Sequence, residues 1–214
     1  MESIDLLIGR YPKLIGCRAD LLSALDLLCD GFRRGGTLFT CGNGGSAADA
    51  DHIVGELAKG FLEKRPVSAA LREALAVYPD GDAIADGLQG GLPAVSLHSQ
   101  SALLTAFAND CEPSLVYAQA LYALAKPGDL LLAISTSGNS RNVVNAAKLA
   151  KVRGVTVIAL TGEKPSQLSA LADCAIRVGD TETYRVQELH LPAYHWLCAG
   201  VEAAFFAEKT GGTT

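Results

Sequence analysis

The chain has 214 residues, of which 49% are hydrophobic and 19% charged, so it is long and apolar enough to fold around a buried core. Its formal net charge of −5 disfavours non-specific binding to nucleic acid or to an anionic membrane surface. The six cysteines include no C-x-x-C pair, so we expect neither a disulfide framework nor a structural zinc finger. No apolar run approaches the roughly 20 residues that span a bilayer, and the N-terminus lacks the basic start of a secretion signal, so we expect a cytoplasmic protein.

The first part of the chain is predicted to be helical. Within residues 13–34, apolar side chains recur at spacings of three and four, which is typical of an amphipathic helix. Pro12 either starts this helix or separates it from a shorter one, and the pair Gly35-Gly36 ends it. Residues 1–36 therefore form an N-terminal helical segment in front of the main domain, residues 37–214.

Strands and helices alternate in the main domain. Buried strands are predicted at residues 37–41, 94–97, 130–134, 155–160 and 174–178. Helices are predicted at residues 47–59, 101–108, 114–125, 141–152, 165–172 and 184–208. This alternation indicates an α/β fold with a parallel sheet covered on both faces, and five strands fit a flavodoxin-like, doubly wound sheet. The stretch 67–91, rich in proline and glycine, is expected to be an inserted excursion with a short helix at 68–77.

Two polar turns directly follow predicted strands. In the first, Gly42–Ser46, glycines let the backbone approach a ligand, and the next helix offers free N–H groups to an anion. A tight turn capped by Ser46 is the alternative, and the lysine of a P-loop is absent. The second turn, Ser135–Ser140, gathers four hydroxyls and one asparagine, which suits a phosphate monoester. Both turns are expected at the carboxyl edge of the sheet, where ligands bind.

Several runs of sequence resemble one known family. CGNGGSAADADH at 41–52 and LLAISTSGNS at 131–140 look like the sugar isomerase (SIS) domain, and the runs FAND at 107–110, ALTG at 159–162 and VQELH at 186–190 are similar to its phosphoheptose isomerase branch. The resemblance covers nearly the whole chain apart from the excursion. It implies a homotetramer built partly on the N-terminal segment, with active sites between subunits. The implied reaction converts sedoheptulose 7-phosphate to D-glycero-D-manno-heptose 7-phosphate, toward the heptose of bacterial lipopolysaccharide.

The resemblance also assigns roles to individual residues. Glu56 is expected to be the base that moves a proton through an enediol(ate), and His195 its acid/base partner. Both, together with His52 and Gln187, match a ligand set for one divalent metal, expected to be Zn²⁺. The substrate-binding residues that the resemblance implies are Asn43, Gly44, Ser46, Asn109, Asp110, Ser135, Thr136, Ser137, Ser140 and Gln187.

Spacing limits how the four metal-site residues can meet. His52 and Glu56 are four residues apart and share one helix face, although a solvated pair is the simpler interpretation without the resemblance. Gln187 and His195 are eight residues apart, which separates them by ~12 Å and ~80° on a straight helix. We therefore expect a site assembled across a subunit interface, or one against a helix distorted at Pro192.

Three positions depart from the family pattern and leave alternatives open. Gln100 and Tyr184 stand where the family isomerases tend to carry acids, and Gly60 stands where an arginine is frequent. Another sugar phosphate, as substrate or as sensed ligand, is therefore possible. The segment 92–110 is also similar to a tetrameric adaptor of the same superfamily that binds the bacterial replication initiator. That adaptor lacks the groups that match Glu56 and His195, which favours an enzyme. The expected partners are a small sugar phosphate and further copies of the chain, not nucleic acid or membrane.

Overall fold

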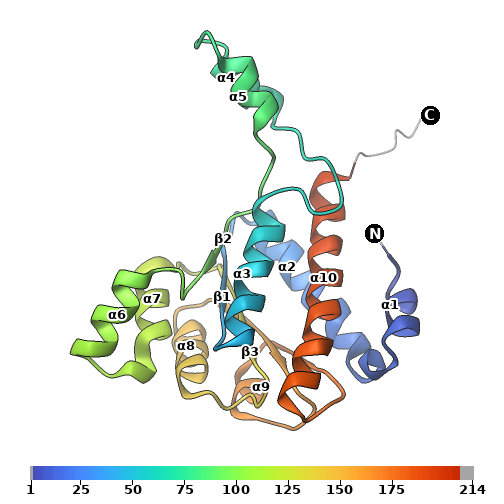
Figure 1. Ribbon diagram of the computed structural model, residues 1–214, viewed down its shortest axis with the longest axis vertical. Helices are drawn as coiled ribbons and strands as arrows, with labels where there is room; N and C mark the ends of the chain where they lie inside the picture. Colours follow the sequence, from blue (N-terminus) through green and yellow to red (C-terminus); the bar gives the residue numbers. More distant parts are fainter. Residues whose placement is uncertain (1, 208–214) are drawn as a thin grey trace.

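The computed structural model describes residues 2–207. Its five strands form one parallel sheet in the order β2-β1-β3-β4-β5, drawn in Figure 1. This is the strand order of a flavodoxin-like, doubly wound sheet, so the predicted fold class is confirmed. The strands are β1 (Leu38–Cys41), β2 (Ala94–Ser96), β3 (Leu130–Ser135), β4 (Thr156–Thr161) and β5 (Cys174–Arg177).

The helices follow the predicted pattern with one addition. The α-helices are α1 (Ile4–Arg10), α2 (Arg18–Arg33), α3 (Gly45–Ala58), α4 (Ala69–Leu75), α5 (Gly81–Gly87), α6 (Ser101–Asp110), α7 (Val116–Leu124), α8 (Arg141–Val152), α9 (Gln167–Leu171) and α10 (Thr183–Phe206). Short 3₁₀ helices at Pro12–Cys17 and Pro113–Leu115 precede α2 and α7. Pro12 thus separates α1 from α2, while the predicted end of the last helix at residue 208 lies outside the described residues. Among those residues, no helix has the length and apolarity needed to cross a membrane.

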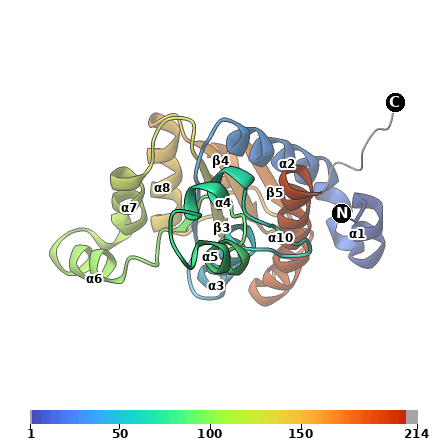
Figure 2. The same cartoon turned by 90° about the horizontal axis from the view of Figure 1, so that it is seen from above.

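Helices cover both faces of the sheet, as Figure 2 shows from above. Successive strand residues point to opposite faces, so Leu130 and Leu132 pack with α1, α2, α3 and α10, whereas Leu131 and Ala133 pack with α7, α8 and α9. Every residue of β3 is buried, which is typical of a central parallel strand. The apolar side chains of the N-terminal segment belong to the same core as the sheet. All six cysteines lie in the described part of the chain and are free, and Cys111 is the exposed one.

The excursion after α3 forms a pair of short helices that projects away from the sheet (Figure 1). Helix α4 was expected, but α5 was not, because the glycines at both of its ends are typical of a loop. Arg72 of α4 forms exposed ion pairs with Asp82 and Asp86 of α5. At the base of the excursion, Gln89 accepts a hydrogen bond of 2.7 Å from the backbone N–H of Gly60.

Candidate active site

The two polar turns lie side by side because β1 and β3 are neighbours in the sheet. Cys41 at the end of β1 pairs in register with Ala133 of β3. The side-chain amides of Asn43 and Asn142 then exchange two hydrogen bonds of 2.9 Å across the turns. This is also the point where the strand order reverses, which is where ligands bind in open α/β sheets. The prediction that both turns meet at one edge is confirmed.

The first turn leads directly into α3. Its N-cap is Gly44, at a φ of 55° that favours glycine, and no side chain caps the helix. Ser46, the alternative cap, is instead buried within the first turn of α3. A Cβ on Gly45 would lie 2.7 Å from Nε2 of Gln187, so the Gln187 side chain of α10 lies directly against this turn. The uncapped helix end is therefore free to bind an anion.

Hydroxyl groups collect in the second turn, in front of α8. The Oγ atoms of Ser135 and Ser140 lie 3.0 Å apart, and Ser140 is the N-cap of α8 without a capping hydrogen bond to the helix backbone. Ser137 Oγ accepts a hydrogen bond from the backbone N–H of Asn139. The turn thus gathers these hydroxyls, with Thr136 between them, next to the start of α3. Two helix N-termini and a cluster of hydroxyls form a suitable cradle for a phosphate.

Asn109 and Asp110 lie on a different element, helix α6. Both are exposed at the end of α6, where Asn109 Nδ2 donates a hydrogen bond of 2.8 Å to Asp110 Oδ1. Among the described residues, no hydrogen bond joins either side chain to the two turns. Their role in binding substrate therefore stays a prediction.

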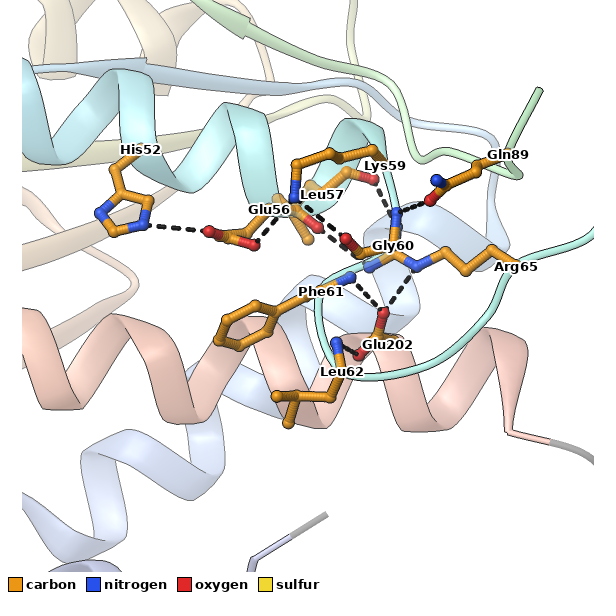
Figure 3. A network of polar contacts seen from close by, with 10 residues as sticks. All are labelled: His52, Glu56, Leu57, Lys59, Gly60, Phe61, Leu62, Arg65, Gln89 and Glu202. Carbon is orange, nitrogen blue, oxygen red and sulfur yellow. Dashed lines mark hydrogen bonds and ion pairs between the residues drawn. The ribbon is translucent and has the colours of Figure 1, made fainter. Parts of the chain in front are cut away.

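Further along α3, His52 and Glu56 face each other, as the spacing predicts. His52 Nε2 lies 3.0 Å from Glu56 Oε1 (Figure 3). The second carboxylate oxygen, Oε2, is buried and makes no hydrogen bond, although Lys59 Nζ lies 3.7 Å from it. The His52 side chain is 42% exposed and that of Glu56 is 13% exposed, so the pair lies at the protein surface. Glu56 thus has one oxygen paired with His52 and one, Oε2, that makes no hydrogen bond and faces Lys59.

Helix α10 brings His195 to this pair. The His52 and His195 rings meet edge to face at a centroid distance of 4.9 Å, and His195 Nε2 is buried without a hydrogen-bond partner. Burial lowers the pKa of His195, and the nearby His52 lowers it further against the opposing effect of Glu56. The ring is therefore held in its neutral form, with Nε2 available to a ligand.

The course of α10 explains why Gln187 and His195 lie beside different parts of α3. Helix α10 continues through Pro192 and runs alongside α3 in the same direction, so Gln187 meets Gly45 while His195 meets His52 two turns later. Among residues 2–207, no three His, Cys, Asp or Glu side chains are arranged so that they could hold a metal ion together. The donor atoms are of the types that zinc prefers, and two of them are unpartnered, but the four-residue metal site stays a prediction.

Sequence reasoning missed two pairs of residues near the site. The Tyr194 hydroxyl lies 3.0 Å from His52 Nδ1 and donates a hydrogen bond of 3.2 Å to Asp49 Oδ1. Arg65 and Glu202 form a fully buried ion pair at the end of α3 (Figure 3). The position of Tyr194 beside His195 was a weak signal. No sequence signal pairs Arg65 with Glu202, because 137 residues separate them.

Gly60 and His190 also bear on the candidate site. Gly60 stands where a family arginine is frequent, and the next arginine, Arg65, pairs with Glu202, so the cation that faces the Glu56 carboxylate is Lys59, at 3.7 Å. His190, three residues after Gln187, is fully buried on α10. Burial lowers the pKa of His190 to about 4, and the nearby backbone of Thr161 opposes this only in part. His190 is therefore a neutral core residue.

Comparisons with known proteins agree with this fold. The model of the SIS domain family matches residues 74–162, which include β2, β3, β4 and the second polar turn, so this part of the sheet is that of a SIS-domain protein. The phosphoheptose isomerase of Mycobacterium tuberculosis is 43% identical over 184 residues, which cover 86% of this chain and 82% of that relative. That of Synechocystis is 36% identical over 190 residues, covering 89% and 86%. The structure of phosphoheptose isomerase from Neisseria gonorrhoeae has a TM-score of 0.70 at 28% identity, covering 93% of this chain and 98% of that one. The chain belongs to the phosphoheptose isomerase family.

Proposed function

We propose that the protein is an aldose–ketose isomerase that converts sedoheptulose 7-phosphate to D-glycero-D-manno-heptose 7-phosphate through an enediol(ate). One observation carries the proposal. The two polar turns meet at the β1/β3 edge of the sheet, and the first of them leads into α3, the helix that also carries the Glu56 carboxylate. The named relatives support this substrate. The alternative of another sugar phosphate is tested by assaying a panel of ketose and aldose phosphates, in which the heptose phosphate should have the highest kcat/KM.

The phosphate would bind between the two turns. The uncapped starts of α3 and α8 would offer backbone N–H groups to the anion, and the hydroxyls that would join them are Ser46, Ser135, Thr136, Ser137 and Ser140. Asn43 and Gly44 shape the first turn, and Gln187 lies against it. The acidic net charge of the chain gives no general attraction for a phosphate, so these local dipoles and hydroxyls must supply the binding energy.

Replacing Ser140 by alanine is expected to raise KM for sedoheptulose 7-phosphate by about 10–100-fold, because a hydrogen bond to a charged group contributes about 1.5–3 kcal/mol. The change in kcat should be small, since the phosphate is bound in both the ground state and the transition state. Steady-state kinetics measure the effect, and Ser23→Ala on the exposed face of α2 is the matched control. An unchanged KM in Ser140→Ala would contradict the phosphate cradle.

Proton transfer would take place further along α3. Isomerisation moves a proton between adjacent carbons, which requires a base at the carbon and a group that stabilises the oxygen. Glu56 Oε2 would act as the base and His195 Nε2 as its acid/base partner, since both atoms are buried and make no hydrogen bond within the chain. His52 Nε2 lies 3.0 Å from the other carboxylate oxygen of Glu56, a contact that would open if both residues held a metal ion.

The metal is proposed on the chemistry of the donor set. His52, Glu56, Gln187 and His195 would hold one divalent ion, expected to be Zn²⁺, which when bound polarises the carbonyl and hydroxyl oxygens of the sugar. We expect metal analysis of the purified protein to find about one ion per chain, since a single four-donor set is complete with one zinc. His195→Ala should lose that ion. A metal-free preparation with full turnover would rule the metal out.

We also propose that the protein is a cytoplasmic homotetramer with active sites between subunits. The N-terminal segment exposes the large apolar side chains Leu6, Ile15 and Leu22, which favour contact with another subunit. The exposed positions of His52 and of Asp110 are consistent with a site completed by a neighbouring copy. Light scattering on the purified protein tests the proposal, and a monomer that turns over substrate would contradict it.

A further inference from the structure

The excursion, residues 67–91, has no core of its own. Its helices α4 and α5 have seven residues each, and helices this short are marginal in water unless they pack against another surface. No residue of α4 is buried, and the buried residues of α5 are Gly81 and Ala85, which bring little apolar area. Because the pair projects away from the sheet (Figure 1), the sheet and its covering helices do not supply that surface.

The tip of the excursion, residues 76–80 between α4 and α5, is apolar and acidic. Val77 is 76% exposed and Tyr78 is 60% exposed. Asp80 follows them, and the tip contains no cation. Leu71 of α4 is exposed as well. Exposed apolar side chains that gather in one place mark a site of interaction.

A cavity of about 780 Å³, which we call the base cavity, lies at the base of the excursion beside the end of α10. Its apolar lining is formed by Phe61, Leu62, Leu88 and Phe206. Lys64 and Glu63 add one charge of each sign, and the other charged residues of the lining, Arg65 and Asp86, are held in ion pairs. Apolar burial, rather than net charge, would therefore hold an occupant.

The tip and the base cavity of one chain suit the base cavity and the tip of a second copy. We propose that two copies dock through their excursions about a two-fold axis, with the tip of each copy in the base cavity of the other. Val77 and Tyr78 would then be buried against the apolar lining, and Asp80 would approach Lys64 of the partner subunit. A single contact of this kind covers both tips, fills both cavities and keeps the two acidic tips apart.

The proposed tetramer requires a contact of this kind. A closed tetramer built on two-fold axes needs two different two-fold contacts. The N-terminal segment, with its exposed Leu6, Ile15 and Leu22, would supply one of them. The excursions would supply the second, because they follow the end of α3 that is remote from the two polar turns.

The first test replaces Tyr78 by aspartate. A carboxylate is costly to bury in an apolar cavity, so we expect Tyr78→Asp to halve the mass of the assembly measured by light scattering. Tyr122→Asp on α7 is the matched control, because Tyr122 is 57% exposed and lies outside the excursion, and its assembly should have the mass of the wild type. Circular dichroism should show the same helix content in all three proteins, because both tyrosines are exposed within one chain.

A second test locates the tip of one copy relative to the other copy. Lys64→Cys and Asp80→Cys are made in separate chains that also carry Cys111→Ser, because Cys111 is the exposed cysteine. When the two chains are co-expressed, a short bis-maleimide reagent should link them into a dimer that is visible on a denaturing gel. Each variant alone should stay largely unlinked, because the two copies of either position would lie at opposite ends of the contact.

Both readouts are independent of turnover, so this inference and the proposed function fail separately. An active protein in which Tyr78→Asp keeps the wild-type mass, or a wild-type chain that is monomeric, would overturn the docking. Efficient linking in either single variant, or no linking in the mixture, would overturn the two-fold arrangement. A protein that assembles as expected but does not convert the heptose phosphate would refute the proposed function alone.

Discussion

Replacing Glu56 by glutamine is expected to lower kcat for sedoheptulose 7-phosphate by about 10²–10⁴-fold, the range that a positioned general base contributes. The amide has nearly the same shape as the carboxylate but cannot take up the proton, so the free Oε2 loses its function while the helix keeps its fold. Binding of the phosphate should persist because the two turns are unaltered. Initial rates in both directions and equilibrium binding of the substrate measure the two effects separately.

The matched control for this substitution is Glu73→Gln on α4, where the side chain is exposed and remote from the turns. Its kinetic constants should equal those of the wild type. A Glu56→Gln variant with normal kcat would show that another group removes the proton. A variant that loses binding as well as turnover would instead indicate that Glu56 supports the structure of the site.

Replacing Arg65 by methionine is expected to lower the free energy of unfolding by about 3–5 kcal/mol, the cost of removing one partner of a buried ion pair. The Arg65 side chain is 0% exposed and that of Glu202 is 1% exposed, and their Nε and Oε1 atoms lie 2.8 Å apart. Arg65 also donates to the carbonyl oxygens of Leu57 and Glu56, at 2.8 and 2.9 Å, and so holds the end of α3 (Figure 3). Denaturant unfolding measures the loss.

A surface pair supplies the control for this second variant. Arg18 bonds Asp5 at 3.1 Å, but both side chains are largely exposed, so Arg18→Met should change the free energy of unfolding by less than about 1 kcal/mol. The double variant Arg65→Met/Glu202→Leu should recover much of the lost stability, because no buried charge is left unpaired. An Arg65→Met protein as stable as the wild type would show that water reaches the pair.

The same pair predicts a pH dependence. Burial alone would raise the pKa of Glu202, but the N–H groups of Phe61 and Leu62 and the Arg65 guanidinium outweigh burial and lower it. A carboxylate with a lowered pKa stabilises the fold above its ordinary pKa, and this stabilisation is lost as the pH falls through the lowered value. The stability advantage of the wild type over Glu202→Gln should therefore shrink below about pH 4.

Local patterns predicted most of the elements. Helix α8 has the predicted bounds because a polar turn, an apolar face and a final Arg-Gly pair mark them, and β3 follows from an unbroken apolar run. Helix α5 was missed because its interior is short and its ends are glycines. Its partner, α4, contacts it through Arg72, a contact that no local pattern reveals.

The sequence by itself determined the fold class, through the alternation of strands and helices along the chain. It also determined the two polar turns and the face shared by His52 and Glu56, because each of these depends on residues within one turn or one helix. The tertiary structure alone decided which residues of α10 meet α3. Gln187 against Gly45, Tyr194 against Asp49 and Glu202 against Arg65 join residues more than 130 positions apart. Such pairs depend on the direction and register of two packed helices, and hydrophobic spacing within either helix carries no information about that register.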